Sequence, residues 1–205
     1  NTSDRPKSFS LFSFVEFCLW NAEDDQTNYQ RNLSLAEVEV EGSAIYHTTE
    51  YRERRNHYAV YGVNAPISGF DTDRDSFLGF GNGFHEAAVP HAGAATGSIS
   101  SGWYPIASHH LQVTLEPGES TERTFVLGYI ENPDDQKWQA PGVVDKTRAR
   151  QLLSQFDTSE QTLAAFQRLG EYWGGLLGTY TLEAGDDKLG RMVNIWNQYQ
   201  CMVTF

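Results

Sequence analysis

Apolar side chains occupy both alternating faces of one stretch near the start of the chain, and this pattern stops abruptly. Residues Ser10–Trp20 (SLFSFVEFCLW) carry bulky groups at odd and even positions, whereas Asn21–Arg31 (NAEDDQTNYQR) is almost wholly polar. An extended segment that is apolar on both faces must be covered on both sides, so the pattern predicts a central strand. The polar stretch is predicted to be a loop anchored by that rigid strand, as binding sites commonly are.

Alternation of apolar and polar residues predicts an antiparallel β-sandwich over residues 1–132. Residues 35–41 alternate Ala and Val with Glu37, Glu39 and Glu41, which predicts a half-buried strand with a carboxylate-lined outer face. Pro117 and Gly118 separate two further alternating segments and predict a hairpin. The glycine-rich stretch from residue 66 to about residue 102 has no sustained period and is expected to be rich in loops. The other predicted strands cover residues 45–49, 57–64, 111–115 and 121–130.

The period becomes helical after Pro141, which predicts a mixed fold of β-sandwich followed by helices. Asp145 is expected to cap a short helix that ends near Phe156. Asp157, with Glu160 three residues later, is typical of a capping-box start for a second helix. We predict a helical linker over residues 133–185 and the first helix of a further domain over residues 186–205. The expected apolar face of the second helix comprises Leu163, Phe166, Leu169, Trp173 and Leu176.

The two ends of the chain suggest a segment of a longer polypeptide. The chain begins at Asn1 without a methionine, and its last helix stops at Phe205 on an apolar turn with no cap or polar tail. A helix that ends in this way is expected to continue. We therefore expect the last helix to open an α-helical domain.

Composition and charge disfavour some binding partners of this chain. The 205 residues are 40% hydrophobic, which predicts a substantial core, and the formal net charge of −12 disfavours binding to nucleic acid or to an anionic membrane. No stretch is long and apolar enough for a membrane span. Cys18 and Cys201 lie far apart, so we expect no disulfide framework and a cytoplasmic location.

Motifs for metals and cofactors are incomplete. Asp71, Asp73 and Asp75 imitate the start of a calcium loop, but Ser76 and Asn82 occupy the positions that need Gly and Glu. Adjacent histidines at positions 109 and 110 point to opposite faces of a strand, and one of them is expected to be a packed core residue. The sequence predicts neither a metal site nor a bound cofactor.

Two polar segments have competing interpretations. Tyr51–Arg55 (YRERR) suits an anion clamp, but a solvated turn paired with the glutamate face of residues 37–41 is favoured. Asn21–Arg31 is either a polar connection or a surface that contacts sugar hydroxyls through amides and a guanidinium. In the second case aromatic residues would supply faces for pyranose rings. Those residues are Trp20, Tyr29, Trp103 and Tyr104.

Four segments together resemble the cellobiose phosphorylases of glycoside hydrolase family 94, of the glycosyltransferase-36 type. They are SFVEFCLWNAEDDQTNYQRN, EVEVEGSAIYHTTEYRERRNHY, GFDTDRDSFLG and RMVNIWNQYQCMVTF, and the last is the most specific. The resemblance implies the latter part of a β-supersandwich, a helical linker and the first helix of an (α/α)6 barrel. It further implies reversible inverting phosphorolysis of cellobiose to α-glucose 1-phosphate and glucose, with inorganic phosphate as co-substrate.

The same resemblance implies which residues bind sugar and which are elsewhere. Asn21, Asn28 and Arg31 match positions at the active-site entrance, contributed across a homodimer to the neighbouring barrel. The family's catalytic Asp and phosphate-binding residues lie beyond Phe205, so the segment alone lacks the catalytic Asp. Two other classes remain open: a non-catalytic carbohydrate-binding module, and a scaffold for dimerisation.

Overall fold

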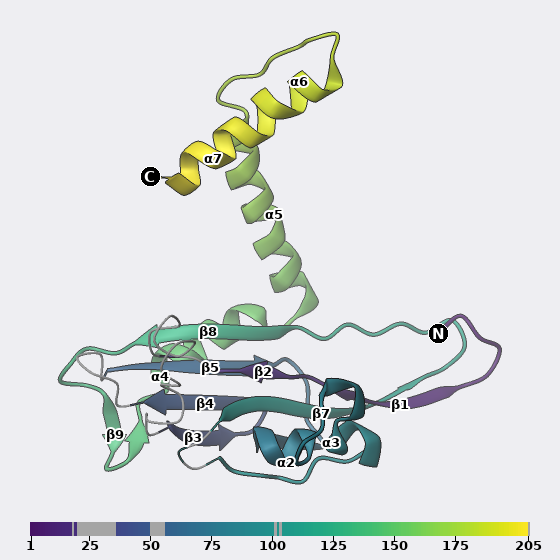
Figure 1. Ribbon diagram of the computed structural model, residues 1–205, viewed down its shortest axis with the longest axis vertical. Coiled ribbons are helices and arrows are strands. Elements are labelled where there is room, and N and C mark those ends of the chain that lie inside the picture. The colour runs from purple at the N-terminus through teal and green to yellow at the C-terminus, as the bar shows by residue number, and fades with distance from the viewer. Residues whose placement is uncertain (18, 20–35, 50–55, 101, 103, 205) are drawn as a thin grey trace. The chain divides into compact units, whose positions relative to one another are not determined.

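The structure is a computed structural model that describes residues 1–17, 19, 36–49, 56–100, 102 and 104–204. It divides into two compact units, Asn1–Asp157 and Thr158–Phe205. Antiparallel strands in two main sheets form most of the first unit, and helices form the second (Figure 1).

One sheet is built around a long central strand, β7. β1 and β2 pair with successive parts of one edge of β7, and β6 pairs with the other edge, all antiparallel. His110 shows this arrangement, because its partners are Phe12 on one side and Gly69 on the other. The strands of this sheet are β1 (Lys7–Phe12), β2 (Val15–Glu16), β6 (Gly69–Asp73) and β7 (Pro105–Leu115).

The other main sheet has the order β3-β4-β5-β8 and is also antiparallel. Every residue of β5 is buried, as expected for an inner strand that is covered on both faces. β9 (Trp138–Ala140) and β10 (Val143–Val144) form a separate small hairpin. The four strands of this sheet are β3 (Ala36–Glu41), β4 (Ala44–Thr49), β5 (His57–Val63) and β8 (Phe125–Glu131).

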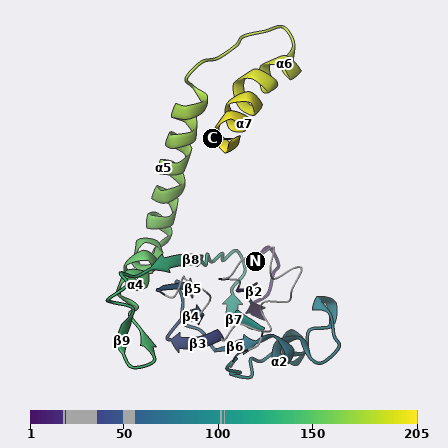
Figure 2. The same ribbon diagram turned by 60° about the vertical axis from the view of Figure 1, so that its left-hand side comes forward.

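The two faces of this second sheet pack against different partners. Ile45, Ala59 and Tyr61 face the first sheet and form a core with Phe17 and Ala107. The opposite face is covered by the segment that contains α4, which lies beside this sheet in Figure 2. Leu152 and Leu153 of this segment pack on buried strand residues. The buried members of this second core are Ala44, Tyr46, Tyr58, Val60, Ile130, Val144 and Ala149.

Glycines on the two strands nearest α4 (Thr147–Leu153) permit this close packing. A Cβ on Gly62 would lie 2.8 Å from Leu153 Cδ2, and a Cβ on Gly128 would overlap Leu152 Cδ2. Neither site has room for a side chain, because the leucines occupy it. The sheet and the helix therefore fit through residue size as well as through hydrophobic pattern.

A third apolar cluster covers the outer face of the first sheet. Short helices supply it: α2 (Arg74–Leu78) brings Phe77 and Leu78, and α3 (Ala88–Ala92) brings Val89, which pack with Ile106 of β7. Phe12 and Phe14 pack against this cluster. Between the two helices lies a 3₁₀ turn, η2 (Phe84–Glu86).

The second unit consists of a long helix, an extended return and a second helical stretch. Asn194 donates to the carbonyl of Leu182 (3.0 Å) and accepts from its N–H (2.7 Å), which ties the return segment to the helix. Among the described residues, no helix is long and apolar enough to cross a membrane. The elements are α5 (Ser159–Leu177), α6 (Asp187–Arg191), the π-helix η4 (Met192–Trp196) and α7 (Asn197–Thr204).

The structure confirms most of the predicted strands and corrects two statements about them. Residues 10–17 do not form a central strand, because β1 and β2 are separated at Ser13 and Phe14 and, among the described strands, pair with β7 alone. Their apolar residues are covered by helices on one side and the second sheet on the other, which explains the two-faced pattern. The predicted hairpin around Pro117 is also wrong, because β7 and β8 belong to different sheets.

The structure confirms two of the predicted helices, with a correction at the start of each. α4 has Lys146 at its N-cap, without a side-chain cap, and Asp145 precedes it and accepts from Thr147 N (2.9 Å) through Oδ1. The following 3₁₀ turn η3 (Ser154–Phe156) ends at the predicted residue. The second helix begins one residue later than expected, because Thr158 is the N-cap. Its capping box is made with Gln161, whose backbone N–H lies 3.3 Å from Thr158 Oγ1.

Histidines within the sandwich are packed as aromatic residues. The ring of His109 forms a cluster with those of Tyr61 (centroids 5.0 Å apart) and Phe125 (6.1 Å), and His110 stacks on Phe12 at 4.5 Å on the outer face. This confirms that the two neighbours point to opposite faces. Burial lowers the pKa of His109 to about 4, and burial likewise lowers the pKa of His47 to about 4.

Acid is expected to destabilise the protein through these two histidines. Between pH 6.5 and pH 4 the unfolded chain binds protons that native His47 and His109 do not, so the free energy of unfolding falls as the pH falls. The lowered pKa corresponds to about 3 kcal/mol for each histidine. Urea denaturation from pH 7.5 to pH 4 measures this slope.

Variants separate the buried histidines from other acid-sensitive groups. His47→Phe is expected to remove about half of the slope, whereas His91→Gln, at an exposed residue of α3, should leave it unchanged. An equal slope in His47→Phe and the wild type would show that His47 is not responsible.

Candidate functional site

The residues predicted to bind sugar, Asn21, Asn28 and Arg31, lie outside the described residues. The structure does describe the chain on either side of them. His57 Nε2 lies 3.0 Å from the carbonyl oxygen of Leu19, so the chain after β2 is held against β5. Ala36 then begins β3, in the opposite sheet. The segment between Leu19 and Ala36 therefore connects the two sheets.

A polar cluster lies where β2 and β7 meet, beside that segment's start. Glu16 pairs with Ile106, and Phe17 N donates to Pro105 O at 3.3 Å. On this end of the sheet Glu16 Oε1 accepts from Arg74 Nε at 2.7 Å. The Arg74 guanidinium carbon lies 6.0 Å from the centroid of the Tyr104 ring.

Tyr104 has an unusual backbone conformation. Its φ angle is +38°, the single positive φ among the described non-glycine residues. A bulky side chain in this region costs on the order of 1 kcal/mol, and such residues concentrate at functional sites. The next residue, Pro105, begins β7, so the strained residue is fixed directly to the central strand.

A buried carboxylate holds the nearby chain in place. Asp71, on β6, is fully buried and accepts hydrogen bonds from both the backbone and the hydroxyl of Thr96 and of Ser98. The neighbouring Thr72 accepts from Ser100 N at 2.8 Å. The aspartates singled out by the sequence thus bind backbone, and Asp73 caps α2 by accepting from Ser76 N.

The cluster offers an aromatic ring, a guanidinium and a carboxylate, which together suit a polar neutral ligand. Tyr104 was expected from the sequence as a sugar-facing aromatic residue. Glu16 and Arg74 were not expected, because Glu16 interrupts an apolar strand and Arg74 lies within the aspartate motif that imitates a calcium loop. The alternation of charge in that motif was the one sequence feature that could have indicated Arg74 as a site residue.

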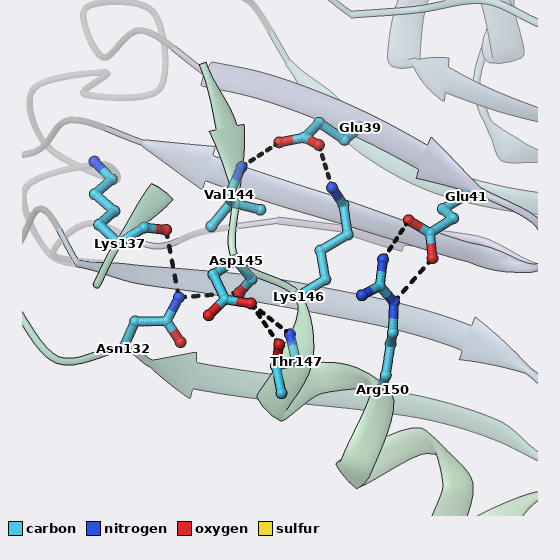
Figure 3. Close-up of polar contacts among 9 residues, drawn as sticks. All are labelled: Glu39, Glu41, Asn132, Lys137, Val144, Asp145, Lys146, Thr147 and Arg150. Atoms are coloured by element: carbon cyan, nitrogen blue, oxygen red, sulfur yellow. Dashed lines mark hydrogen bonds and ion pairs between the residues drawn. The ribbon is translucent and has the colours of Figure 1, made fainter. Parts of the chain in front are cut away.

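A second polar cluster fastens the linker to β3 (Figure 3). Glu39 accepts from Lys146 Nζ (2.5 Å) and from Val144 N (3.0 Å), while Glu41 forms two bonds with Arg150 at 2.9 and 3.0 Å. Asn132 Nδ2, buried beneath, donates to the carbonyl of Asp145 at 3.0 Å. Figure 3 shows the glutamates of β3 meeting Lys146, just before α4, and Arg150 within it.

These contacts give partners to two residues of the glutamate face that the sequence did not predict. Glu39 pairs with Lys146 and Glu41 with Arg150, whereas the arginines of residues 51–55, which were expected to pair with this face, lie outside the described residues. The bond to Arg150 is the main reason that the pKa of Glu41 is lowered. Burial raises the pKa of Tyr46, whose ring lies beneath Lys146 Nζ at 5.3 Å, to about 12.

Family models match both parts of the chain. The model of the glycosyl hydrolase 94 supersandwich domain matches residues 1–158, and that of the glycosyl hydrolase 94 superfamily catalytic domain matches residues 172–205. The chain belongs to the glycosyl hydrolase 94 family. The first match covers the unit in which the two sheets and α4 pack together, and it agrees with the antiparallel sandwich seen here.

Relatives within glycosyl hydrolase 94 include phosphorylases with different sugars. The chain is 26% identical over 206 residues to an N,N'-diacetylchitobiose phosphorylase of Vibrio furnissii, covering 98% of this chain and 23% of that protein. It is 25% identical over 214 residues to a 3-O-beta-D-glucopyranosyl-beta-D-glucuronide phosphorylase of Paenibacillus borealis (99% and 25%). A cyclic beta-(1,2)-glucan synthase, NdvB of Rhizobium meliloti, is 24% identical over 204 residues (98% and 7%). The chain spans about a quarter of the length of these phosphorylases.

The ion pair between Glu39 and Lys146 is expected to contribute more to stability than the pair between Glu41 and Arg150. Lys146 is 4% exposed, so Lys146→Met leaves a half-buried carboxylate without its cation and should cost about 2–3 kcal/mol of unfolding free energy. Arg150 and Glu41 are half exposed, and Arg150→Gln should cost under about 1 kcal/mol.

A double-mutant cycle tests this ranking by chemical denaturation. Glu39→Gln combined with Lys146→Met should be less destabilised than the sum of the single variants, because neither charge is then left unpaired. Additive effects would show that the two side chains contribute independently.

Proposed function

We propose that the polypeptide carrying this chain is an inverting phosphorylase that cleaves a β-linked disaccharide, with cellobiose as the first substrate to test. The observation that carries the proposal is the order of the two glycosyl hydrolase 94 matches along one chain, supersandwich and then catalytic domain. The similarity to two phosphorylases supports the reaction class. Their different sugars leave the choice of disaccharide to experiment.

The proposed reaction forms one bond and breaks one. A phosphate oxygen attacks the anomeric carbon from the face opposite the glycosidic oxygen, and that oxygen leaves with a proton from a general acid. The products are an α-sugar 1-phosphate and a free sugar. The attacking phosphate is itself the nucleophile, so no carboxylate base is needed. The resemblance assigns the acid to an Asp beyond Phe205, which leaves the described residues with no step in bond cleavage.

The role proposed for this chain is to support substrate binding. Arg31 is proposed to hold two sugar hydroxyls with its fork of N–H groups, while Asn21 and Asn28 border the entrance and oppose longer chains. In a homodimer this loop would serve the neighbouring active site. A cytoplasmic enzyme without a bound cofactor, using inorganic phosphate as co-substrate, completes the proposal.

A non-catalytic role is the alternative. A carbohydrate-binding module would need only the sandwich, whereas this chain continues through α5 into residues that match a catalytic domain. A scaffold for dimerisation remains compatible with the same elements. Gel filtration separates it from a module, because a scaffold should dimerise in the absence of sugar.

Phosphate-dependent cleavage is the first prediction. With cellobiose, the polypeptide that carries this chain should release glucose 1-phosphate only when phosphate is present. N,N'-diacetylchitobiose and 3-O-β-D-glucopyranosyl-β-D-glucuronide serve as parallel substrates. Faster release from either of these would reject cellobiose but retain the reaction class. Sugar release that does not depend on phosphate, or no release from any of the three, would reject the phosphorylase.

Arg31→Ala is expected to raise the Michaelis constant for the disaccharide about tenfold, because a bidentate hydrogen bond to hydroxyls contributes on the order of 1–2 kcal/mol. Arg123→Ala is the matched control, because Arg123 is exposed and bonds only locally, to Thr121 and Glu122. Gel filtration should show the same oligomeric state in both. An unchanged constant in Arg31→Ala would remove Arg31 from the site.

A further inference from the structure

We propose that Tyr104, Arg74 and Glu16 form a contact site for a glucopyranosyl unit of the β-linked substrate. This inference rests on the proposed function and names further sugar-contacting residues for it. The site lies on described parts of β2, α2 and the entry to β7, and the resemblance assigned sugar contacts elsewhere. Its parts are an aromatic face, a guanidinium with unused donors and a carboxylate that fixes the guanidinium.

The backbone of Tyr104 indicates that its side chain is placed there for more than packing. Its φ of +38° would be adopted without strain by glycine, which occupies most other left-handed positions in this chain. A tyrosine that served only to connect Gly102 to β7 would gain stability by replacement with glycine. Retention of a strained aromatic residue is expected where the ring itself is needed.

Arg74 presents hydrogen-bond donors close to that ring, because its guanidinium carbon lies over the ring, 6.0 Å from the centroid. Its described hydrogen bond uses Nε alone, toward Glu16, and about a third of its side chain is exposed. The four N–H groups of the two terminal nitrogens have no described protein acceptor. A guanidinium that is fixed in this way can donate to two vicinal hydroxyls, while the apolar face of the same pyranose lies on an aromatic ring.

Rigid neighbours hold the three residues in place. Glu16 is in register with Ile106, and Arg74 follows Asp73, the residue that caps α2. The hydrogen bonds of Asp71 and Thr72 tie residues 96–100 to β6, close to the start of α2. Precise positioning of this kind favours a binding site over a solvated ion pair, whose partners gain little from being fixed.

The position also fits the proposed function. Phe17 N bonds to Pro105 O, so the residue after Glu16 lies against the residue after Tyr104. The segment proposed to contact sugar, which contains Asn21, begins four residues after Phe17. Both groups of contacts therefore arise from the same end of the sandwich.

The decisive experiment compares Tyr104→Gly with Tyr104→Phe in the complete enzyme. Glycine removes both the ring and the strain, so the midpoint of thermal unfolding should stay the same or rise while the Michaelis constant for cellobiose rises about tenfold. Phenylalanine keeps the ring and the strain. The Michaelis constant should therefore stay within about twofold of the wild type, and the unfolding midpoint within about two degrees. In both variants kcat should change less than threefold, since no bond is broken by these residues.

Arg74→Met provides a second test that keeps the apolar length of the side chain. It should raise the same constant about fivefold, and Arg74→Lys should recover little because it lacks the fork of donors. Arg123→Met serves as the control for a lost arginine. A lower unfolding midpoint in Tyr104→Gly with an unchanged Michaelis constant would assign Tyr104 to structure and overturn the proposal. An unchanged constant in Arg74→Met would remove Arg74.

Failure of the proposed function is distinguishable from failure of this site. If the wild type releases sugar phosphate and the variants match it, the site alone is wrong. If the wild type is inactive on every disaccharide, calorimetric titration with cellobiose and with cellotetraose still tests binding. Loss of the heat of sugar binding in Tyr104→Gly but not in Tyr104→Phe would support the site. Equal heats of binding in both variants would overturn it.

Discussion

Burial of the β3-β4-β5-β8 sheet on both faces is the constraint on which the rest of the first unit depends. A sheet with one apolar face needs one cover, but the residues of β5 are buried throughout, so the sheet needs two. The first sheet supplies one cover and the residues around α4 supply the other. This explains why Gly62 and Gly128 lie beneath leucines, and why the glutamates of β3 meet the basic residues of the linker. The first part of the predicted linker, up to Asp157, therefore belongs to the sandwich unit, and Val144, Ala149, Leu152 and Leu153 pack in its core.

The same constraint determines what the histidines can do. His47 and His109 are buried among aromatic rings, and burial holds the pKa of each near 4. A neutral, enclosed imidazole cannot exchange protons with a substrate near neutral pH, so these two residues serve packing. Chemistry is therefore to be sought at the ends of the strands, where the polar groups of β2, α2 and the entry to β7 are accessible.

The hydrogen bonds of Asp71 fix the chain that leads to the strained residue Tyr104. The buried carboxylate satisfies the backbone of residues 96–98, and a fully bonded buried carboxylate gives a rigid support. The chain that follows reaches β7 through the one described non-glycine residue in the left-handed region. A rigid support is what makes such a conformation tolerable, since neighbouring bonds offset its cost. The proposed sugar contact uses this rigidity, because little freedom remains to be lost on binding.

Local pattern in the sequence determined the strands at residues 36–41, 44–49 and 57–63 and the short helix after Asp145. It also determined that His109 and His110 point in opposite directions. Periods of 2 and 3.6 residues are sufficient for this, because they report which face of an element is buried. Tertiary structure decided the rest. The described part of the apolar run, residues 10–17, forms edge strands with a break, since cover on both faces can come from helices as well as from strands. The supposed hairpin at Pro117 joined two sheets, because alternation does not specify a strand's partner. The association of Glu16, Arg74 and Tyr104 could not be predicted either, since these residues are distant in sequence and meet only through the register of β2, β6 and β7.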